Sequence, residues 1–315
     1  MTTNSWVFNP PHVHALTTNG AAAGPADDPS VYVFHDNIVL SVKVALATGR
    51  PLLVRGAPGT GKSSLAMHVA DVLQWRYYER VITSRTQARD LLYEVDLLQR
   101  LQDAQSKSLS DDYAHYVRPG VLWWAFDSKS AARRGRPEGA TINDGLADPG
   151  LSRKEAARAV VLLDEIDKAD PDVPNNLLGP LGSLRFLVDE TNAEVRCNEG
   201  NAPLLILTTN EERVLPKAFL RRCVELELPK PDRGRLLEIG KARFPVQKGV
   251  AAALDVDGLL KALVGDAPDA ELPSPAEFVD TLRAARDLRI HPTSAEWEAL
   301  TKITVFKPKA RREST

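Results

Sequence analysis

The chain has 315 residues, of which 43% are hydrophobic and 26% are charged, the balance of a globular protein that can bury a core. The length suits one large domain or two modest ones. Lys and Arg number 40 against 42 Asp and Glu, and this net charge of −2 argues against a nucleic-acid partner. Two cysteines, Cys197 and Cys223, are too few for a disulfide framework or a four-thiolate metal site.

Targeting signals are not evident in the sequence. Residues 1–16 lack the apolar run of a signal peptide, and no apolar stretch nears the roughly 18–20 residues of a membrane-spanning helix. We therefore expect a cytoplasmic protein with no membrane partner. The six histidines are scattered without H-E-x-x-H spacing, so a metal enzyme of that type is not indicated.

The first two thirds of the chain alternate between strand and helix signals. A flexible leader at residues 1–30 precedes a buried helix that begins at Asp36 or Asn37 and ends at Gly49. Five strands are predicted at residues 52–55, 80–84, 159–163, 204–208 and 223–228. The first, third and fourth are continuously apolar, as expected for parallel strands covered on both faces. The pattern predicts an open α/β sheet.

Only helical patterns follow Pro229 and Pro231. They cover residues 233–244, 256–264, 275–288 and 294–305, and they predict a small all-helical second domain. We thus divide the chain into a leader (1–30), an α/β core (31–228), a helical domain (229–305) and a basic tail (306–315). Within the core, residues 128–149 form a long loop, and such loops are usually functional or mobile.

The most specific motif is a glycine-rich loop between the first strand and a helix. It reads GAPGTGKS over residues 56–63, a full G-x-x-x-x-G-K-S match in the required context. Its glycines let backbone N–H groups point at phosphate oxygens, near the positive end of the next helix. Lys62 would span the β- and γ-phosphates, and the Ser63 hydroxyl would bind Mg²⁺. The expected nucleotide-binding residues are Gly56, Ala57, Pro58, Gly59, Thr60, Gly61, Lys62, Ser63 and Ser64.

Two adjacent carboxylates follow the apolar strand at residues 159–163. Successive strand residues point to opposite sides, so Asp164 and Glu165 can take different roles. We expect Asp164 to hold Mg²⁺ through water and Glu165 to polarise the water that attacks the γ-phosphate. Both would lie at the carboxyl edge of the sheet, where α/β proteins bind ligands, and this argues against simple helix caps.

Two weaker signals come later in the chain. Asn210 follows the strand at residues 204–208, and its amide could bind the attacking water or the γ-phosphate, or could equally form a turn. Arg221 and Arg222 stand just before the last strand. A guanidinium there could stabilise the charge of a phosphoryl-transfer transition state, although an ordinary surface pair is the alternative.

Together these signals have the order and spacing of an AAA+ ATPase, and the chain resembles the MoxR-like branch of that family. The resemblance covers about residues 31 to 305. Besides the motifs already described, it rests on four segments: residues 81–93 (VITSRTQARDLLY), 116–126 (YVRPGVLWWAF), 164–169 (DEIDKA) and 215–223 (LPKAFLRRC).

The resemblance implies a fold, a site and an assembly. The fold would be a P-loop NTPase core, a five-stranded and mostly parallel sheet between helices, with a C-terminal all-helical lid. The implied motifs are Walker A at residues 56–63, Walker B at Asp164 and Glu165, sensor 1 at Asn210, and an arginine finger at Arg222 or, as second choice, Arg221. The finger would act on the nucleotide of a neighbouring subunit, so the resemblance implies a homo-oligomeric ring, typically of six subunits.

Members of this branch use ATP and Mg²⁺ and act as chaperone-like remodellers, often beside a partner with a von Willebrand factor A domain. This chain departs from the family pattern in two places. Gly179, Pro180 and Gly182 stand where relatives carry a regular helix, so we expect that helix to bend or stop. Ala276 stands where many relatives carry the sensor 2 arginine, and the resemblance assigns no sensor 2 residue here.

Other functions remain open at this point. A nucleotide-dependent assembly switch with little turnover would keep the phosphate loop without using Glu165 for hydrolysis. Another P-loop enzyme, such as a small-molecule phosphotransferase, would usually lack the paired acids, the sensor asparagine and the helical lid. A nucleic-acid motor is disfavoured by the net charge of −2. The sequence does not name the protein that would be remodelled.

Overall fold

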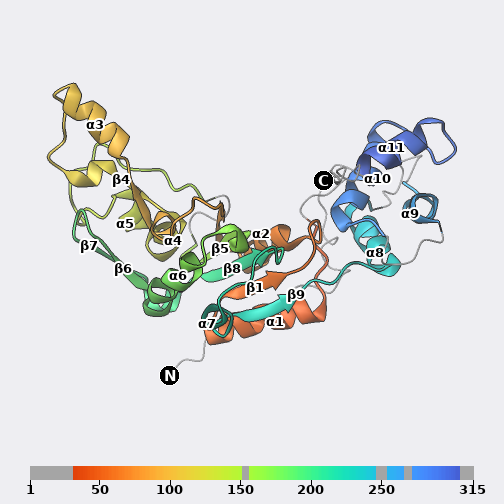
Figure 1. The fold of residues 1–315 in the computed structure, drawn as a ribbon, viewed down its shortest axis with the longest axis horizontal. Coiled ribbons are helices and arrows are strands. Elements are labelled where there is room, and N and C mark those ends of the chain that lie inside the picture. The colour runs from red at the N-terminus through yellow and green to blue at the C-terminus, as the bar shows by residue number, and fades with distance from the viewer. Residues whose placement is uncertain (1–30, 151–155, 246–253, 266–271, 306–315) are drawn as a thin grey trace, which may run out of the picture. The chain divides into compact units, whose positions relative to one another are not determined.

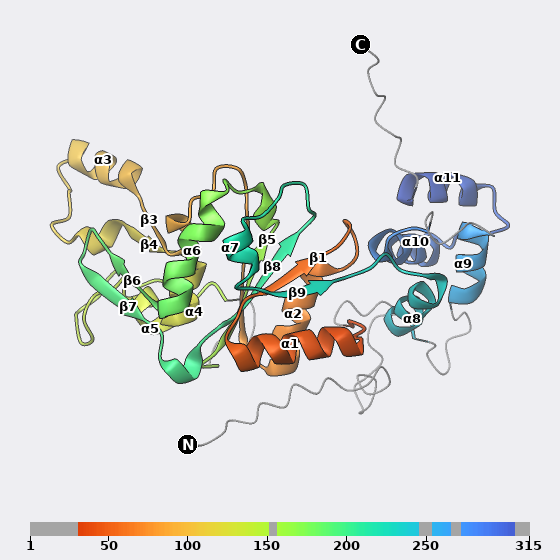
Figure 2. The same ribbon diagram turned by 60° about the horizontal axis from the view of Figure 1, so that its bottom comes forward.

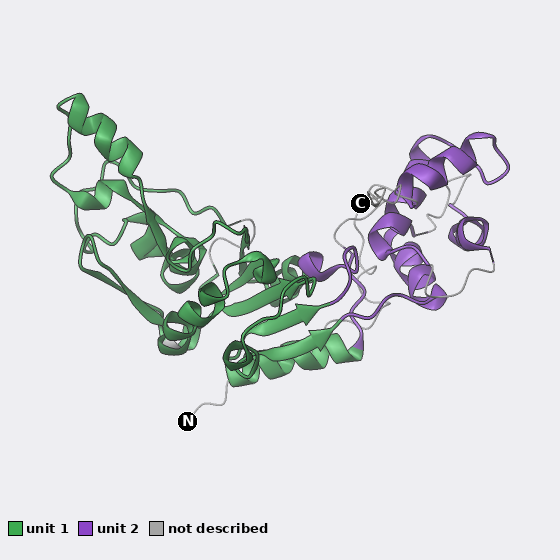
Figure 3. Cartoon of the chain, in the orientation of Figure 1, with its two compact units in different colours: residues 1–9, 36–55, 65–227 green, residues 10–35, 56–64, 228–315 purple. Residues whose placement is uncertain are grey.

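The computed structural model describes residues 31–150, 156–245, 254–265 and 272–305 (Figure 1). The predicted leader at residues 1–30 and the basic tail at residues 306–315 lie outside the described residues. The chain divides into two compact units (Figure 3). The first contains residues 36–55 and 65–227, and the second contains the glycine-rich segment 56–64 together with residues from 228 onward. The predicted domain boundaries stay a prediction.

A five-stranded sheet forms the centre of the first unit. Its strands are β1 (Leu52–Arg55), β2 (Arg76–Val81), β5 (Ala159–Asp164), β8 (Leu204–Thr209) and β9 (Val224–Glu227). They lie in the order β2-β5-β8-β1-β9, and every pairing between neighbours is parallel. The expected five-stranded α/β sheet is therefore confirmed. Because the strands are parallel, their carboxyl ends share one edge of the sheet.

Helices cover both faces of this sheet. Those of the first unit are α1 (Asp36–Thr48), α3 (Leu97–Gln105), α4 (Val121–Phe126), α5 (Ser128–Ala132), α6 (Asp172–Ser183) and α7 (Lys217–Leu220), and α2 (Lys62–Leu73) begins in the glycine-rich segment. Helix α1 runs below β1 and β9 in Figure 2 and contacts both. Strand residues alternate between faces, and Leu53, Val161 and Leu207 share one buried cluster with Trp123 and Phe219.

The second strand in chain order was misplaced by sequence analysis. We expected it at residues 80–84, whereas β2 begins four residues earlier. The reason is that its buried half looks polar: Tyr77 and Tyr78 are buried, and so is Arg76, which donates from Nη1 to the Tyr78 hydroxyl at 2.9 Å. The apolar Val81, which lies inside the predicted range, is exposed. Burial of hydrogen-bonded polar groups hides such a strand from a hydrophobicity pattern.

Two further strand pairs did not appear in the sequence analysis. They are the antiparallel pairs β3 (Tyr93–Val95) with β4 (Val117–Pro119), and β6 (Arg185–Val188) with β7 (Ala193–Arg196). Strands of three or four residues are too short to give a clear alternation. The helix expected to bend or stop near Gly179, Pro180 and Gly182 is α6, which contains Pro180 and ends at Ser183, just before Leu184, whose φ is 49°.

The second unit ends in four helices. They are α8 (Arg233–Arg243), α9 (Val256–Val264), α10 (Pro275–Asp287) and α11 (Glu296–Thr304), each within two residues of its predicted bounds. Helix α10 begins with a capping box, in which Ser274 and Glu277 exchange side-chain and backbone hydrogen bonds. Leu236, Phe278 and Leu282 are fully buried among these helices. Across the described segments, no helix combines the length and apolar character needed to cross a membrane.

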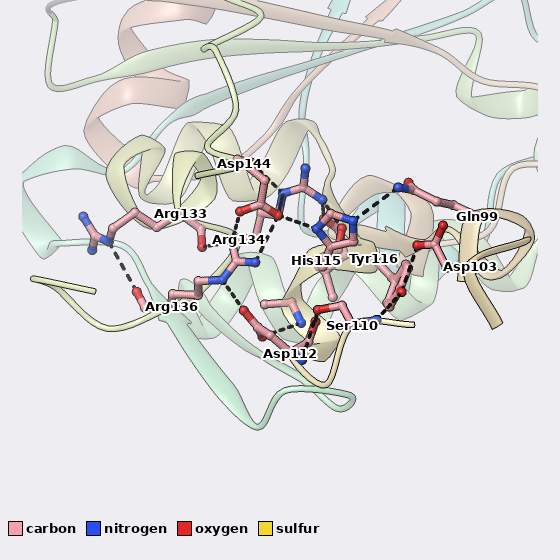
Figure 4. A network of polar contacts seen from close by, with 12 residues as sticks. Gln99, Asp103, Ser110, Asp112, His115, Tyr116, Arg133, Arg134, Arg136 and Asp144 are labelled. Atoms are coloured by element: carbon pink, nitrogen blue, oxygen red, sulfur yellow. Dashed lines mark hydrogen bonds and ion pairs between the residues drawn. The ribbon is translucent and has the colours of Figure 1, made fainter. Parts of the chain in front are cut away.

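The long loop expected at residues 128–149 begins later than predicted, because residues 128–132 form helix α5. The loop that follows α5 is held by ion pairs centred on Asp144 (Figure 4). Arg136 Nη1 lies 3.0 Å from Asp144 Oδ1, and His115 Nδ1 lies 2.7 Å from Asp144 Oδ2. Arg136 also reaches Asp112, with 2.5 Å between Nε and Oδ2. Burial alone would raise the pKa of the Asp144 carboxyl, but hydrogen bonds from Arg136 and His115 outweigh burial and hold the pKa below its usual value.

Replacing Asp144 with asparagine should lower the free energy of unfolding by about 2 kcal/mol at neutral pH, because Arg136 and His115 lose the carboxylate that they bind. Since the folded pKa is depressed, the stabilisation is present above the unfolded pKa near 4 and is lost as pH falls through the lower folded pKa. Urea unfolding of Asp144→Asn and wild type at neutral and acid pH checks both points. The exposed Glu138→Gln in the same loop is the control, and an equal loss in both variants would contradict the prediction.

Candidate active site

Asp164 lies at the carboxyl end of β5, next to the end of β8. The register pairs Leu163 with Leu207, which brings Asp164 level with Thr208. The Thr208 hydroxyl donates a short hydrogen bond to Asp164 Oδ1 and accepts one from the Glu165 N–H at 2.9 Å. One buried threonine thus holds both members of the acidic pair.

Glu165 does not belong to the strand. Strand β5 ends at Asp164, and Glu165 has φ 60° and ψ 48°, the left-handed conformation. Such a conformation costs a non-glycine residue of order 1–3 kcal/mol and persists only where its surroundings enforce it. The expectation that both acids point from a regular strand is therefore wrong for Glu165. The sharp turn instead directs its carboxylate toward the end of β8.

Two side chains bind the Glu165 carboxylate. Asn210 Nδ2 donates to Oε1 at 3.3 Å, and Lys168 Nζ donates to Oε2 at 2.6 Å. The hydrogen bond to Glu165 is the main reason that the pKa of Lys168 is raised, because it favours the charged ammonium. The structure thus brings three predicted site residues, Asp164, Glu165 and Asn210, to one edge of the sheet.

A buried aspartate joins the two loops that carry these residues. Asp167 is only 2% exposed, and its Oδ2 accepts a hydrogen bond from the Glu212 N–H at 2.9 Å. Asp167 follows β5 and Glu212 follows β8, so this contact fixes the distance between the loop of Glu165 and that of Asn210. A carboxylate in such a buried position must be hydrogen-bonded, which ties the geometry of the two loops together.

The glycine-rich segment begins at Gly56, one residue after β1 ends. Gly59 has φ 79° and Gly61 has φ 92°, conformations that L side chains rarely adopt. Lys62 is 6% exposed, and its Nζ donates to the carbonyl oxygens of Gly56 at 2.7 Å and Ala57 at 2.9 Å. Two carbonyl oxygens of the loop therefore bind the Lys62 ammonium group.

The start of α10 contacts this loop within the second unit. The Ala276 N–H donates to the Gly59 carbonyl at 3.3 Å, and a Cβ at Gly59 would lie 2.6 Å from Ser274 Oγ. Ala276 occupies the position at which the family resemblance would place a sensor 2 arginine. A methyl group carries no charge, so Ala276 can contribute only its backbone here.

Arg221 and Arg222 do not join the acidic edge. Both are exposed and precede β9 at its amino end. In the sheet, Val224 and Ile206 pair with the same residue of β1, Leu52. Asn210 lies four residues beyond Ile206, a rise of about 13 Å along the strands. Val224, two residues after Arg222, thus lies at the opposite end of the sheet from Asn210.

The residues at the two motifs suit Mg²⁺. Asp164 offers carboxylate oxygen and Ser63 offers a hydroxyl, the hard oxygen ligands that Mg²⁺ prefers. Among the residues that the structure describes, no three His, Cys, Asp or Glu side chains form a metal-binding group. Mg²⁺ is commonly held by one or two protein ligands together with substrate phosphates, so each of these two side chains by itself is a suitable ligand. When bound, Mg²⁺ supplies charge neutralisation to the phosphate oxygens.

Sequence reasoning missed Thr208 and Lys168. Thr208 became visible only through the register of β5 against β8, which no local pattern reveals. Lys168 gave a usable signal, because it follows Glu165 by three residues and such spacing allows contact on a helical turn.

The chain is a P-loop ATPase, because its parallel sheet carries a phosphate loop after one strand and paired acids after another. The family model described as AAA domain (dynein-related subfamily) matches residues 51–223, more than half of the chain. The chain therefore belongs to this family of AAA+ ATPases, and nucleotide binding is a property of the family.

Solved structures show weaker similarities. The chain is 16% identical to a RuvB variant of Thermotoga maritima, with a TM-score of 0.45, covering 85% of this chain and 67% of that one. It is 15% identical to the RuvB Holliday junction branch migration motor of the same organism, with a TM-score of 0.44, covering 84% and 65%. A protein of Cytophaga hutchinsonii is 14% identical, with a TM-score of 0.41, covering 84% and 79%. No curated protein matches the chain.

Proposed function

We propose that the chain is a MoxR-like AAA+ ATPase that hydrolyses ATP in the presence of Mg²⁺. The observation that carries this proposal is the Glu165 carboxylate, held by Asn210 and Lys168 beside Asp164. A carboxylate in that position can accept a proton from the attacking water. Asn210 orients the carboxylate, and Lys62 binds the β- and γ-phosphates. Asp164 and Ser63 hold Mg²⁺.

The proposed assembly is a homo-oligomeric ring, typically of six subunits in this branch, in the cytoplasm. Its support is the arginine pair: Arg222, or else Arg221, is exposed and lies at the end of the sheet opposite to Asn210. A neighbouring subunit's nucleotide is the target that such a residue can serve. The ring would couple hydrolysis to chaperone-like remodelling or activation of a partner protein, for which a protein with a von Willebrand factor A domain is the candidate.

Phosphate release from ATP by the purified chain tests this function. We expect steady ATP turnover with Mg²⁺ and none with EDTA. The control is Asp172→Asn, which changes an exposed carboxylate near the acidic pair and should leave hydrolysis at the wild-type rate. A nucleotide-dependent assembly switch would give a different result: ATP would bind and promote assembly, while phosphate release stayed at the rate of Glu165→Gln. That outcome would replace the remodelling ATPase by the switch.

A further inference from the structure

Arg50 lies in the short connection between α1 and β1, and its guanidinium binds the turn before β9. Nη2 donates to the carbonyl oxygen of Arg221 at 2.7 Å and to that of Cys223 at 2.6 Å. Nε donates to the carbonyl oxygen of Arg222 at 3.2 Å. One side chain thus binds three consecutive carbonyls in the segment that carries both candidate finger residues.

These carbonyls need such a donor. Helix α7 is a single turn that ends at Leu220 with Arg221 as its C-cap, so the carbonyls of residues 221–223 lie beyond the helix and receive no hydrogen bond from a following helical turn. Basic side chains commonly satisfy carbonyls at this end of a helix. Because the guanidinium is planar and presents its N–H groups in a fixed fork, binding three carbonyls with it restricts their relative positions. A lysine would place one compact ammonium there instead.

Arg50 is itself anchored beside the turn that it binds. The next residue, Pro51, accepts a hydrogen bond from the Val224 N–H at 2.8 Å, and Leu52 pairs with Val224 in the sheet. The backbone of Arg50 is therefore fixed to the start of β9, and its side chain returns to the three residues just before that start. The side chains of Arg221 and Arg222 are exposed, and Arg222 Nη1 donates to the Ala218 carbonyl oxygen at 3.5 Å.

We propose that Arg50 is the positioning residue of the arginine finger. It holds the backbone of Arg221 and Arg222 so that the finger's guanidinium leaves the subunit in one direction. This inference rests on the proposed function, in which Arg222 stabilises the transition state on a neighbouring subunit. A displacement of about 1 Å in a catalytic group can cost about 10²-fold in rate, so a loosened turn is enough to impair a finger.

Replacing Arg50 with alanine should slow ATP hydrolysis by about 10- to 100-fold and leave ATP affinity unchanged. Arg80→Ala is the matched control, because Arg80 is a half-exposed arginine whose surface ion pair to Glu94 lies outside this turn. Arg50→Lys should fall between the alanine variant and wild type. Should Arg50→Ala fail to fold, as urea unfolding would reveal, Arg50→Lys alone carries the test through its slower hydrolysis at unchanged affinity.

Two readouts separate positioning from a general structural role. Arg50→Ala mixed with Lys62→Ala should regain hydrolysis, because the second protein supplies an intact finger to a sound nucleotide site. The double variant Arg50→Ala/Arg222→Ala should hydrolyse no more slowly than Arg222→Ala, since there is no finger left to position.

Wild-type hydrolysis by Arg50→Ala, alongside an impaired Arg222→Ala, would overturn the role of Arg50 and leave the finger standing. Reduced ATP affinity in Arg50→Ala, or a further loss in the double variant, would also overturn it. Wild-type hydrolysis by both Arg221→Ala and Arg222→Ala would instead remove the finger, and with it the proposed ring mechanism.

Discussion

Lys62→Ala should abolish ATP binding, whereas Glu165→Gln should bind ATP and fail to hydrolyse it. Lys62 is the cation of the glycine-rich loop, where its Nζ now rests on the Gly56 and Ala57 carbonyls. Without it the loop retains only backbone dipoles to bind the β- and γ-phosphates. Glutamine in place of Glu165 keeps the shape and the contact with Asn210, but an amide cannot take a proton from water.

The two losses are measured separately. Binding of a fluorescent ATP analogue should disappear in Lys62→Ala and stay within a few-fold of wild type in Glu165→Gln. Phosphate release by Glu165→Gln should fall about 10²- to 10⁴-fold, the usual contribution of a general base. Lys261→Ala, which removes an exposed lysine on α9, and Asp172→Asn are the controls. Equal loss of ATP affinity in both site variants would contradict this division of roles.

The sequence predicted those parts of the molecule that depend on local pattern. The continuously apolar runs became β1, β5 and β8, because central parallel strands are buried on both faces. The helices of the second unit were found by their periodic patterns, and the glycine-rich loop by its spacing. Asp164, Glu165 and Asn210 were expected at one edge, because each follows a strand of the sheet.

What escaped prediction depends on non-local contacts. The buried part of β2 can contain polar side chains because Arg76 and Tyr78 form a hydrogen bond with each other. The sequence does not reveal that these two polar groups are paired. The left-handed turn at Glu165 is enforced by a hydrogen bond to Thr208, a residue brought near by strand register. The contacts of Arg50 span more than 170 positions of the chain, and no pattern within a window reports them.

The largest assembly-dependent effect is expected for Arg222. Arg222→Ala should bind ATP normally and hydrolyse it up to about 10³-fold more slowly, the loss typical of an arginine finger. Strand register supports action on a neighbour: Arg222 precedes the amino end of β9, whereas Asn210 follows the carboxyl end of β8. Hydrolysis per subunit should also rise with protein concentration, because each site needs an adjacent finger. Arg221→Ala is the comparison, and the variant with the larger loss identifies the finger.

Mixing two inactive proteins provides the decisive measurement. Arg222→Ala has a sound nucleotide site and no finger, while Lys62→Ala has a sound finger and no nucleotide. Where the two proteins are neighbours in a ring, the finger of the Lys62→Ala subunit should allow the Arg222→Ala subunit to hydrolyse ATP. Mixed rings should therefore regain activity that neither protein has alone. Native mass spectrometry establishes that mixed oligomers form. If mixed oligomers form and activity does not return, the arginine acts within its own subunit or has no catalytic role. Full activity in a strictly monomeric protein would exclude the ring altogether.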